Sequence, residues 1–447
     1  MAVWSQIQKS ALYGELRIDA EFYKPDYLNA DRIIREGNHS RLGDLLASLY
    51  RYPTFYGFEF VSEGVPCLKG EDIEATGFVR PKSGDCVTEG ISKRFPLTII
   101  QNEDLIISVR GLVGKVGLVG TELQGAQISP NLIRAKVNKK IDPLYLWCFL
   151  NSSFGLMQFD RYKMRTSQET IVSSDIKNII VPLMDEELQK SIRQHVLMAR
   201  EKKQSGEALI AEAEAILTAA LGLDRVDLTP LLFYEDTFAH AAARLDAEYF
   251  SPRMQRVIKT LSRDGLTIGN VAPLAKRAFK PVAGQPFDYI EIADINTSGT
   301  AESKTVPGED AASRATWIVK PGDIITSTVR PIRRLSAAIM PEQDGFVCSS
   351  GFAVLRPRDI EPEVLLTYLR LPLVAELLDL HTTASMYPAI STADLLRIPV
   401  SLPNTETRAA IIAKVRKSFA ARAESLRLLD EAKQTVEAAI LGTRKEK

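Results

Sequence analysis

Residues 185–221 form the stretch that most constrains how this chain can fold, because they run for about ten helical turns without a proline. Their apolar residues recur mostly at steps of three and four, the spacing of one face of an α-helix. This stripe consists of Ile192, Val196, Ala199, Leu209, Ala213, Ile216, Leu217 and Ala220. Most other residues are good helix formers, although Gly206 costs about 1 kcal/mol relative to alanine. At 1.5 Å per residue the helix would reach roughly 54 Å, too long to lie inside one small domain.

A second stretch of the same kind occupies residues 405–441. Its apolar stripe consists of Ile411, Val415, Phe419, Leu426, Leu429, Val436 and Ile440. Neither narrow stripe can face water, so the two helices are expected to pair. In the alternative interpretation, each helix packs only on its own domain.

The chain also resembles itself. Residues 17–25 (RIDAEFYKP) return as residues 244–252 (RLDAEYFSP), and residues 104–110 (DLIISVR) return as residues 323–330 (DIITSTVR) with one residue inserted. A third block, with Ile171, Asp175, Ile176 and Ile179, matches Ile390, Asp394, Leu395 and Ile398. Because each half ends in a long helix, the order is globular domain, helix, globular domain, helix.

This order predicts an α+β fold with a pseudo-twofold internal repeat. Two mixed α/β domains, residues 1–182 and 223–403, are separated by long helices at residues 183–222 and 404–447. The first helix delivers the chain to the second domain and the second helix must return, so an antiparallel coiled-coil spacer is expected. Strands are predicted at Leu105–Val109, Val116–Val119, Tyr289–Ile295, Asp323–Val329 and Phe352–Leu355, and helices at Pro143–Phe154 and Pro362–Leu371.

Composition places the chain among globular proteins of two or three domains. It has 447 residues, 45% hydrophobic and 25% charged, and its net charge is zero. The apolar runs are far short of a membrane span, and the four cysteines show no CxxC spacing. We therefore expect a cytoplasmic protein with no membrane partner.

Motifs for catalysis are missing from the sequence. The four histidines are scattered without metal-ligand spacing, and neither a GxSxG elbow nor a phosphate-binding glycine loop occurs. The Asn/Asp-Pro-Pro-aromatic tetrad of adenine methyltransferases is also missing. We expect neither an enzyme nor a cofactor or metal site, although a stand-alone enzyme of an unfamiliar kind remains a third interpretation.

Basic residues in connecting segments suggest contact with DNA, since arginine and lysine can neutralise phosphates or grip guanine edges. The alternative is a solvated surface on a scaffold that binds only proteins through its tandem domains. The candidate DNA-binding residues, which include one glutamine and one tyrosine, are Lys93, Arg94, Arg110, Lys115, Arg161, Lys163, Arg165, Gln168, Arg330, Arg333, Arg334 and Tyr387.

These motifs resemble a known family. Residues 322–331 (GDIITSTVRP) and 348–357 (CSSGFAVLRP), followed by 386–390 (MYPAI) and 398–400 (IPV), are similar to the target-recognition domain of type I restriction–modification specificity subunits. Residues 104–115, 130–133 and 181–189 look like the corresponding blocks of the first half. The second helix entry lacks the usual Glu-Gln pair, and residues 166–170 lack the Tyr-Pro-Ala found in the second half. The two domains are therefore expected to read different half-sites.

The resemblance implies a subunit without catalytic residues that reads a bipartite sequence in double-stranded DNA. It would join two methyltransferase subunits and often two motor–nuclease subunits, as part of phage defence. Two domains on a rigid rod could address major-groove faces about one turn, roughly 34 Å, or slightly more apart.

Overall fold

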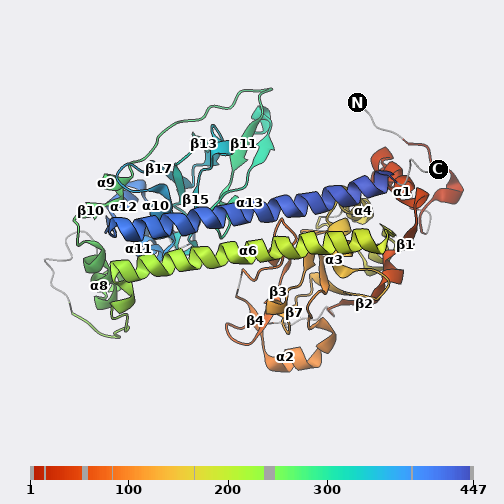
Figure 1. Cartoon of the computed structure of the whole chain (residues 1–447), viewed down its shortest axis with the longest axis horizontal. Helices are drawn as coiled ribbons and strands as arrows, with labels where there is room; N and C mark the ends of the chain where they lie inside the picture. The colour runs from red at the N-terminus through yellow and green to blue at the C-terminus, as the bar shows by residue number, and fades with distance from the viewer. Residues whose placement is uncertain are drawn as a thin grey trace. The chain divides into compact units, whose positions relative to one another are not determined.

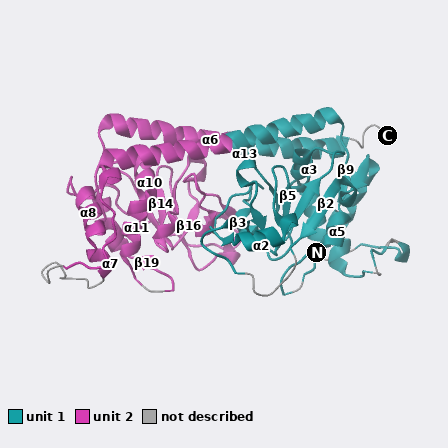
Figure 2. Cartoon of the chain, turned by 90° about the horizontal axis from the view of Figure 1, so that it is seen from below, with its two compact units in different colours: residues 1–201, 424–447 teal, residues 202–423 magenta. Residues whose placement is uncertain are grey.

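The structure, a computed structural model, describes residues 5–14, 17–52, 59–82, 84–165, 167–235, 247–383 and 386–442. The chain divides into two compact units (Figure 2): unit 1 contains residues 1–201 and 424–447, and unit 2 contains residues 202–423. Arg244 and Asp246, part of the first sequence repeat, lie outside the described residues. The unit boundary falls inside both long helices, so each helix contributes to both units.

Unit 1 is built on a four-stranded sheet in the order β2-β8-β5-β6 and a three-stranded sheet in the order β4-β3-β7. A third, two-stranded sheet joins β1 to β9. The strands are β1 (His39–Arg41), β2 (Leu46–Arg51), β3 (Val65–Leu68), β4 (Cys86–Val87), β5 (Leu105–Ser108), β6 (Val116–Leu118), β7 (Gln127–Ile128), β8 (Leu132–Val137) and β9 (Ile180–Pro182). The helices are α1 (Pro25–Glu36), α2 (Glu89–Arg94), α3 (Pro143–Leu150), α4 (Ser153–Tyr162) and α5 (Ser173–Lys177) (Figure 1).

Unit 2 contains a three-stranded sheet in the order β15-β14-β17 and a four-stranded sheet in the order β12-β11-β16-β13. The short pairs β10-β20 and β18-β19 complete it. Its strands are β10 (Leu266–Thr267), β11 (Phe287–Ile290), β12 (Lys304–Val306), β13 (Ala315–Ile318), β14 (Ile324–Ser327), β15 (Ser336–Ala338), β16 (Val347–Ser349), β17 (Phe352–Leu355), β18 (Thr382–Thr383), β19 (Ala389–Ile390) and β20 (Pro399–Val400). Its helices are α7 (Ala247–Phe250), α8 (Pro252–Leu261), α9 (Ile268–Val271), α10 (Pro362–Arg370), α11 (Pro372–Leu380) and α12 (Thr392–Arg397).

The same packing device occurs in both units, which confirms the internal repeat. In unit 1 the left-handed Gly77 leaves no room for a side chain, because a Cβ there would lie 2.7 Å from the buried ring of Trp147. In unit 2 the left-handed Gly299 packs in the same way against Leu366, at 2.9 Å. Trp147 lies on α3 and Leu366 lies on α10. These two residues are separated by the same sequence offset as Asp104 and Asp323. Only glycine adopts this backbone at such close approach without strain.

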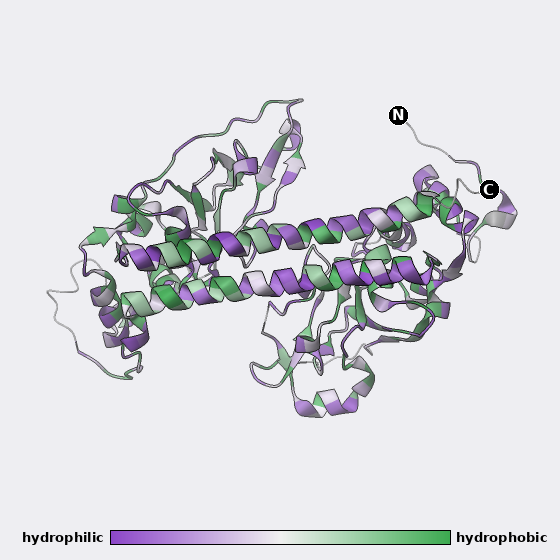
Figure 3. Cartoon of the chain, viewed as in Figure 1, coloured by the Kyte–Doolittle hydropathy of each residue, from purple (hydrophilic) through white to green (hydrophobic). Residues whose placement is uncertain are grey.

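The two long helices are α6 (Glu186–Leu221) and α13 (Thr405–Gly442), close to the predicted ranges. Polar residues start both helices: the Asp185 carboxylate accepts a hydrogen bond from the Leu188 N–H, and the Asn404 side chain accepts one from the Thr407 N–H. Gly222, with φ 72°, follows the end of α6. Apolar and polar residues alternate along both helices (Figure 3).

Within each unit, the two helices pack against one another and against the domain core. In unit 1, Ile192, Val196 and Ala199 share one buried cluster with residues of α13 such as Ala432 and Val436. In unit 2, α6 residues such as Ala213 and Leu217 share a cluster with Ile411 and Val415. In unit 1 the first part of α6 thus packs against the last part of α13, and in unit 2 the last part of α6 packs against the first part of α13. The predicted antiparallel pairing is therefore confirmed in each unit.

The stripe predicted from the sequence is partly wrong. Leu426 is 39% exposed and Ala220 is also exposed, whereas Ile210 and Leu221 are buried. In α13 the buried residues include Ser418 and Ser425. The predicted stripe instead contained the next residue in each case, Phe419 and Leu426. A hydrophobicity pattern misses these serines because their polarity is satisfied inside the contact between the helices.

Two buried serines of α13 donate hydrogen bonds to carbonyl groups of α6. The Ser418 hydroxyl donates to the Gly206 carbonyl at 2.7 Å in unit 2, and the Ser425 hydroxyl donates to the Ala199 carbonyl at 2.6 Å in unit 1. A Cβ at Gly206 would lie 3.3 Å from the Ser418 carbonyl oxygen, closer than usual. The helix-weakening glycine therefore lets the two helices approach where Ser418 bonds.

Replacing Ser418 by alanine should lower the free energy of unfolding by about 1 kcal/mol, because a buried hydrogen bond is lost. The matched control is Ser205→Ala, which removes an exposed hydroxyl one residue from Gly206. Urea denaturation of the full chain measures both variants. Equal stability of the two variants would show that the Ser418 contact contributes nothing.

Two predicted elements end earlier than expected. The helix predicted over Pro143–Phe154 is two helices, because Ser152 caps the N-terminus of α4 by accepting a hydrogen bond from the Gly155 N–H. The strand predicted to Ile295 stops at Ile290, since the Asp294 carboxylate accepts a hydrogen bond from the Glu291 N–H and tightens the chain into a short 3-10 helix.

Candidate nucleic-acid interface

Two loops come together at the same place in each unit. In unit 1 the loop after β5 meets the segment before α5, where the Gly111 N–H donates to the Glu169 carbonyl at 3.2 Å. In unit 2 the loop after β14 meets the segment before α12, where the Arg330 N–H donates to the Pro388 carbonyl at 2.8 Å. Arg330 follows Gly111, and Pro388 follows Glu169, by the same number of residues as Asp323 follows Asp104. Each domain therefore presents an equivalent loop pair.

These contacts correct the alignment read from the sequence. The bridge between Arg110 and Thr170 corresponds to the bridge between Val329 and Ala389, without an inserted residue. Arg330 thus occupies the place of Gly111 rather than that of Arg110. Gln168 in turn occupies the place of Tyr387.

The loop pair of unit 2 exposes a cation stacked on an aromatic ring. The guanidinium carbon of Arg330 lies 5.5 Å from the ring centroid of Tyr387, and Nη2 of Arg330 donates to the Met386 carbonyl at 3.2 Å. Tyr387 is 68% exposed. Arg333 is also exposed and makes no ion pair within the described residues. Arginine over an aromatic ring suits contact with phosphates and bases.

The backbone of this loop is strained. Arg330 has φ 49° and Arg334 has φ 57°, both in the left-handed region that side chains rarely adopt. Gly111, at the place of Arg330, has φ 77°, which costs a glycine nothing. A residue held in this region costs of order 1–3 kcal/mol, and such residues cluster at functional sites.

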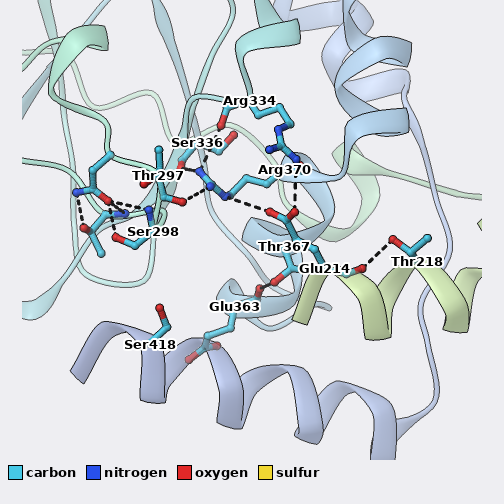
Figure 4. A network of polar contacts seen from close by, with 12 residues as sticks. Glu214, Thr218, Thr297, Ser298, Arg334, Ser336, Glu363, Thr367, Arg370 and Ser418 are labelled. Carbon is cyan, nitrogen blue, oxygen red and sulfur yellow. Dashed lines mark hydrogen bonds and ion pairs between the residues drawn. The ribbon is translucent and has the colours of Figure 1, made fainter. Parts of the chain in front are cut away.

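Arg334, a candidate contact residue, is instead part of a partly buried polar network (Figure 4). Its Nη1 lies 3.4 Å from Oε2 of Glu214 on α6 and donates to the Arg370 carbonyl at 3.1 Å. Arg370 is nearly buried, its Nε lies 3.8 Å from Oε1 of Glu214, and it donates to carbonyls of Thr297, Arg334 and Ser336. The network joins the base of the loop to α6, while Arg330 and Arg333 are exposed.

Glu214 sits in this network at an energetic cost. Burial raises the pKa of its carboxyl above the ordinary value, while the charges of Arg334 and Arg370 act in the opposite direction. The two guanidiniums therefore offset much of the cost of taking the carboxylate out of water.

The corresponding loop of unit 1 presents fewer side chains. Arg110 makes no ion pair or side-chain hydrogen bond within the described residues, and Gln168 is exposed. Lys115 is half-buried: its ammonium donates to the Ile73 carbonyl at 3.3 Å and lines a cavity of about 450 Å³. Burial, with the charge of Lys82, lowers the pKa of Lys115.

Three candidate cations near α4 are already paired with carboxylates. Arg161 lies 3.7 Å from Asp31 and also donates to the Phe22 carbonyl. Lys163 lies 2.5 Å from Asp160, and Arg165 bonds the same Asp160 at 3.2 Å. Their charges are largely compensated, so they support the fold of unit 1 more than they attract DNA.

Lys93 and Arg94 end the short helix α2 of unit 1. Lys93 is highly exposed and pairs with Glu89 one helical turn earlier, at 3.0 Å. Arg94 lies 5.4 Å from the Phe95 ring, and Phe95 in turn contacts the Tyr52 ring at 5.0 Å. Arg51, which precedes Tyr52 at the end of β2, is a cation that the sequence analysis missed. Its signal was the interleaved sequence Tyr50-Arg51-Tyr52, a cation between two aromatic residues.

Other kinds of site find no support among the described residues. They hold no group of three or more His, Cys, Asp and Glu side chains suited to a metal ion. Of the helices described, none combines the length and the apolar character that crossing a membrane requires. Cys67, Cys148 and Cys348 are free and buried, and burial raises the pKa of each thiol to about 12.

Residues 40–195 match the sequence model of a family described as Type I restriction modification DNA specificity domain. No curated protein matches the sequence significantly. Several solved structures are similar, and three of them are as follows. The S subunit of a type I restriction-modification system from M. genitalium is 12% identical, with 89% of this chain and 95% of that chain covered and a TM-score of 0.40.

The second structure, which addresses complex assembly and conformational transition of the type I R-M system, is 21% identical, with 91% and 97% covered and a TM-score of 0.30. The third, the HsdS subunit from Thermoanaerobacter tengcongensis, is 21% identical, with 91% and 96% covered and a TM-score of 0.28.

Proposed function

We propose that this chain, a type I restriction–modification specificity subunit by its DNA specificity domain at residues 40–195, reads a bipartite sequence in double-stranded DNA. The family resemblance seen in the sequence is confirmed, and with it a role in DNA-target specificity. The finer proposal is that residues 1–182 read one half-site and residues 223–403 read the other. The helices at 183–222 and 404–447 would set the spacer between them.

The observation that carries this proposal is the repeated loop pair. The loop after β5 or β14 meets the segment before α5 or α12 through equivalent backbone hydrogen bonds in both units. The side chains presented there differ: unit 2 has Arg330 stacked on Tyr387, whereas unit 1 has Gly111 and Gln168 at these places. Equivalent scaffolds with different exposed side chains are what two different half-sites require.

The chain would act as an adaptor. We propose that it docks two methyltransferase subunits and, in a restriction-competent assembly, two motor–nuclease subunits, which bring the catalytic residues. The described residues of α6 and α13 carry many charged side chains on the faces turned away from their shared core, and these faces could meet such partners.

The test is sequence selection with the full chain co-purified with its methyltransferase subunits. A library of random double-stranded DNA is bound, and the recovered molecules are sequenced. One bipartite motif with a fixed spacer is expected, and affinity for it should fall steeply as salt rises, because phosphate contacts release counterions. Binding without sequence preference, or insensitive to salt, would instead support a scaffold that binds only proteins.

Arg330→Gly should weaken binding to the selected motif about tenfold or more, the range of one lost bidentate base contact. Glycine suits the backbone at this place, as Gly111 does in unit 1, so the loop should keep its conformation. Arg397→Ala is the control, because it removes a highly exposed cation of α12 that pairs with Asp394. If both variants bind like the unchanged protein, Arg330 does not contact the DNA.

A further inference from the structure

Arg51 and Arg110 lie at the same edge of the central sheet of unit 1. Strands β2 and β5 both flank β8 and both run antiparallel to it, so their ends meet at one edge. Arg51, the last residue of β2, is opposite Ile133, and Ile133 is opposite Ile107 of β5. Arg110 follows three residues later, in the loop that meets Thr170.

The two guanidiniums are close to one another, and neither has a carboxylate partner among the residues that the structure describes. Burial, followed by the charge of Arg110, lowers the pKa of Arg51. The Nε of Arg51 is buried without a hydrogen-bond partner, and within the described residues neither arginine side chain makes an ion pair. Residues 53–58, which follow Tyr52 in the sequence, contain no aspartate or glutamate. Two neighbouring cations with an unsatisfied donor are costly unless a ligand completes them.

Unit 2 has a lysine at the place of Arg51. Leu274 pairs with Leu355 as Leu49 pairs with Ala135, so Lys276 is the counterpart of Arg51. The next residue, Arg277, donates to the Asp323 carboxylate.

In unit 1 the equivalent carboxylate, Asp104, is taken by the buried Arg134 at 2.6 Å. Arg134 is opposite Ile106, and Ile325, the counterpart of Ile106 in unit 2, is opposite Val354. The buried aspartate of unit 1 is thus neutralised by an arginine that unit 2 lacks at this place, and Arg51 takes no part in that pair.

We propose that Arg51 and Arg110 form a paired-arginine site that reads a guanine in the half-site of the first domain. This inference rests on the proposed function. Arginine presents parallel donors that match the O6 and N7 acceptors on the major-groove edge of guanine. Two such forks beside exposed Gln168 give the first domain a base-reading set unlike the Arg330–Tyr387 pair of the second domain.

The test uses the selection experiment with the assembled complex and three variants: Arg51→Ala, Arg110→Ala and Arg51→Lys. Each alanine variant should reduce the preference for one guanine in one half-site about tenfold or more, while the other half-site and its preferences stay unchanged. Arg51→Lys keeps the charge and loses the planar fork, so it should recover overall affinity but not the full preference for guanine.

Two controls separate binding from folding. Arg32→Ala removes an exposed arginine of α1 that pairs with Glu36, and should leave the motif unchanged. Arg277→Ala removes the arginine of unit 2 that pairs with the buried Asp323, and should lower the melting temperature without altering the first half-site. The melting temperatures of both Arg51 variants should equal that of the unchanged complex.

Three outcomes would overturn the inference. Equal loss of affinity for all sequences would assign the pair to phosphates, and an unchanged motif would show that the pair does not touch DNA. In both cases the unchanged complex still selects a bipartite motif, so the proposed function stands. A complex of the unchanged chain that selects no motif at all would overturn both proposals.

Discussion

Replacing Glu214 by alanine should lower the free energy of unfolding by about 3 kcal/mol, because removing one partner leaves a buried charge without compensation. The Arg370 side chain is 7% exposed, and Glu214 supplies its carboxylate (Figure 4). Arg370 keeps its contacts with backbone carbonyls, which places the expected loss at the low end for a broken buried ion pair. Chemical denaturation of the full chain, followed by fluorescence, measures the change.

Two variants on the same helix make the test specific. Glu214→Gln keeps a hydrogen-bond acceptor of the same shape and should cost less than Glu214→Ala. Glu212→Ala removes a half-exposed carboxylate that pairs with Lys414 at the surface, and should change stability by less than about 1 kcal/mol. If Glu214→Ala costs no more than Glu212→Ala, the network does not hold the loop to α6.

The arrangement of the fold could be largely predicted from the sequence. Long proline-free stretches with apolar residues at helical spacing end where α6 and α13 end, and β17 matches its predicted range. These features depend on local periodicity and on capping, both of which are visible in one segment at a time. The internal repeat likewise needs only a comparison of the chain with itself.

What the sequence could not supply depends on contacts between distant residues. Ser418 and Ser425 lie in the contact between the helices because carbonyl groups more than two hundred residues away accept their hydrogen bonds. Spacing alone also cannot distinguish a cation held by a carboxylate from one that is free: Lys163 and Arg334 are tied to Asp160 and Glu214, whereas Arg110 has no such partner within the described residues.

The two domains therefore share a scaffold but use their cations differently. A buried aspartate stands at Asp104 in unit 1 and at Asp323 in unit 2, yet the arginines that neutralise it come from different strands and loops. Because backbone contacts hold the loops in place, side chains at their tips can vary at little cost to stability.

Lengthening both helices should lengthen the spacer of the recognised DNA while leaving the two half-sites unchanged. Seven residues inserted after Gly206 in α6, and seven after Lys417 in α13, add about two turns or roughly 10 Å and preserve the spacing of the buried contacts. At about 3.4 Å per base pair, the tolerated spacer should grow by as many as about three base pairs. Sequence selection with the assembled complex measures the spacer directly.

The control inserts the same seven residues into the exposed link between α6 and the second domain, after Asp227. A flexible insertion there adds chain length but leaves the helices, and hence the distance that they fix, unchanged. Only the helix insertions should alter the spacer if the paired helices act as a ruler. An unchanged spacer in the lengthened protein, with both half-sites still recognised, would mean that the distance between the half-sites is set elsewhere in the complex.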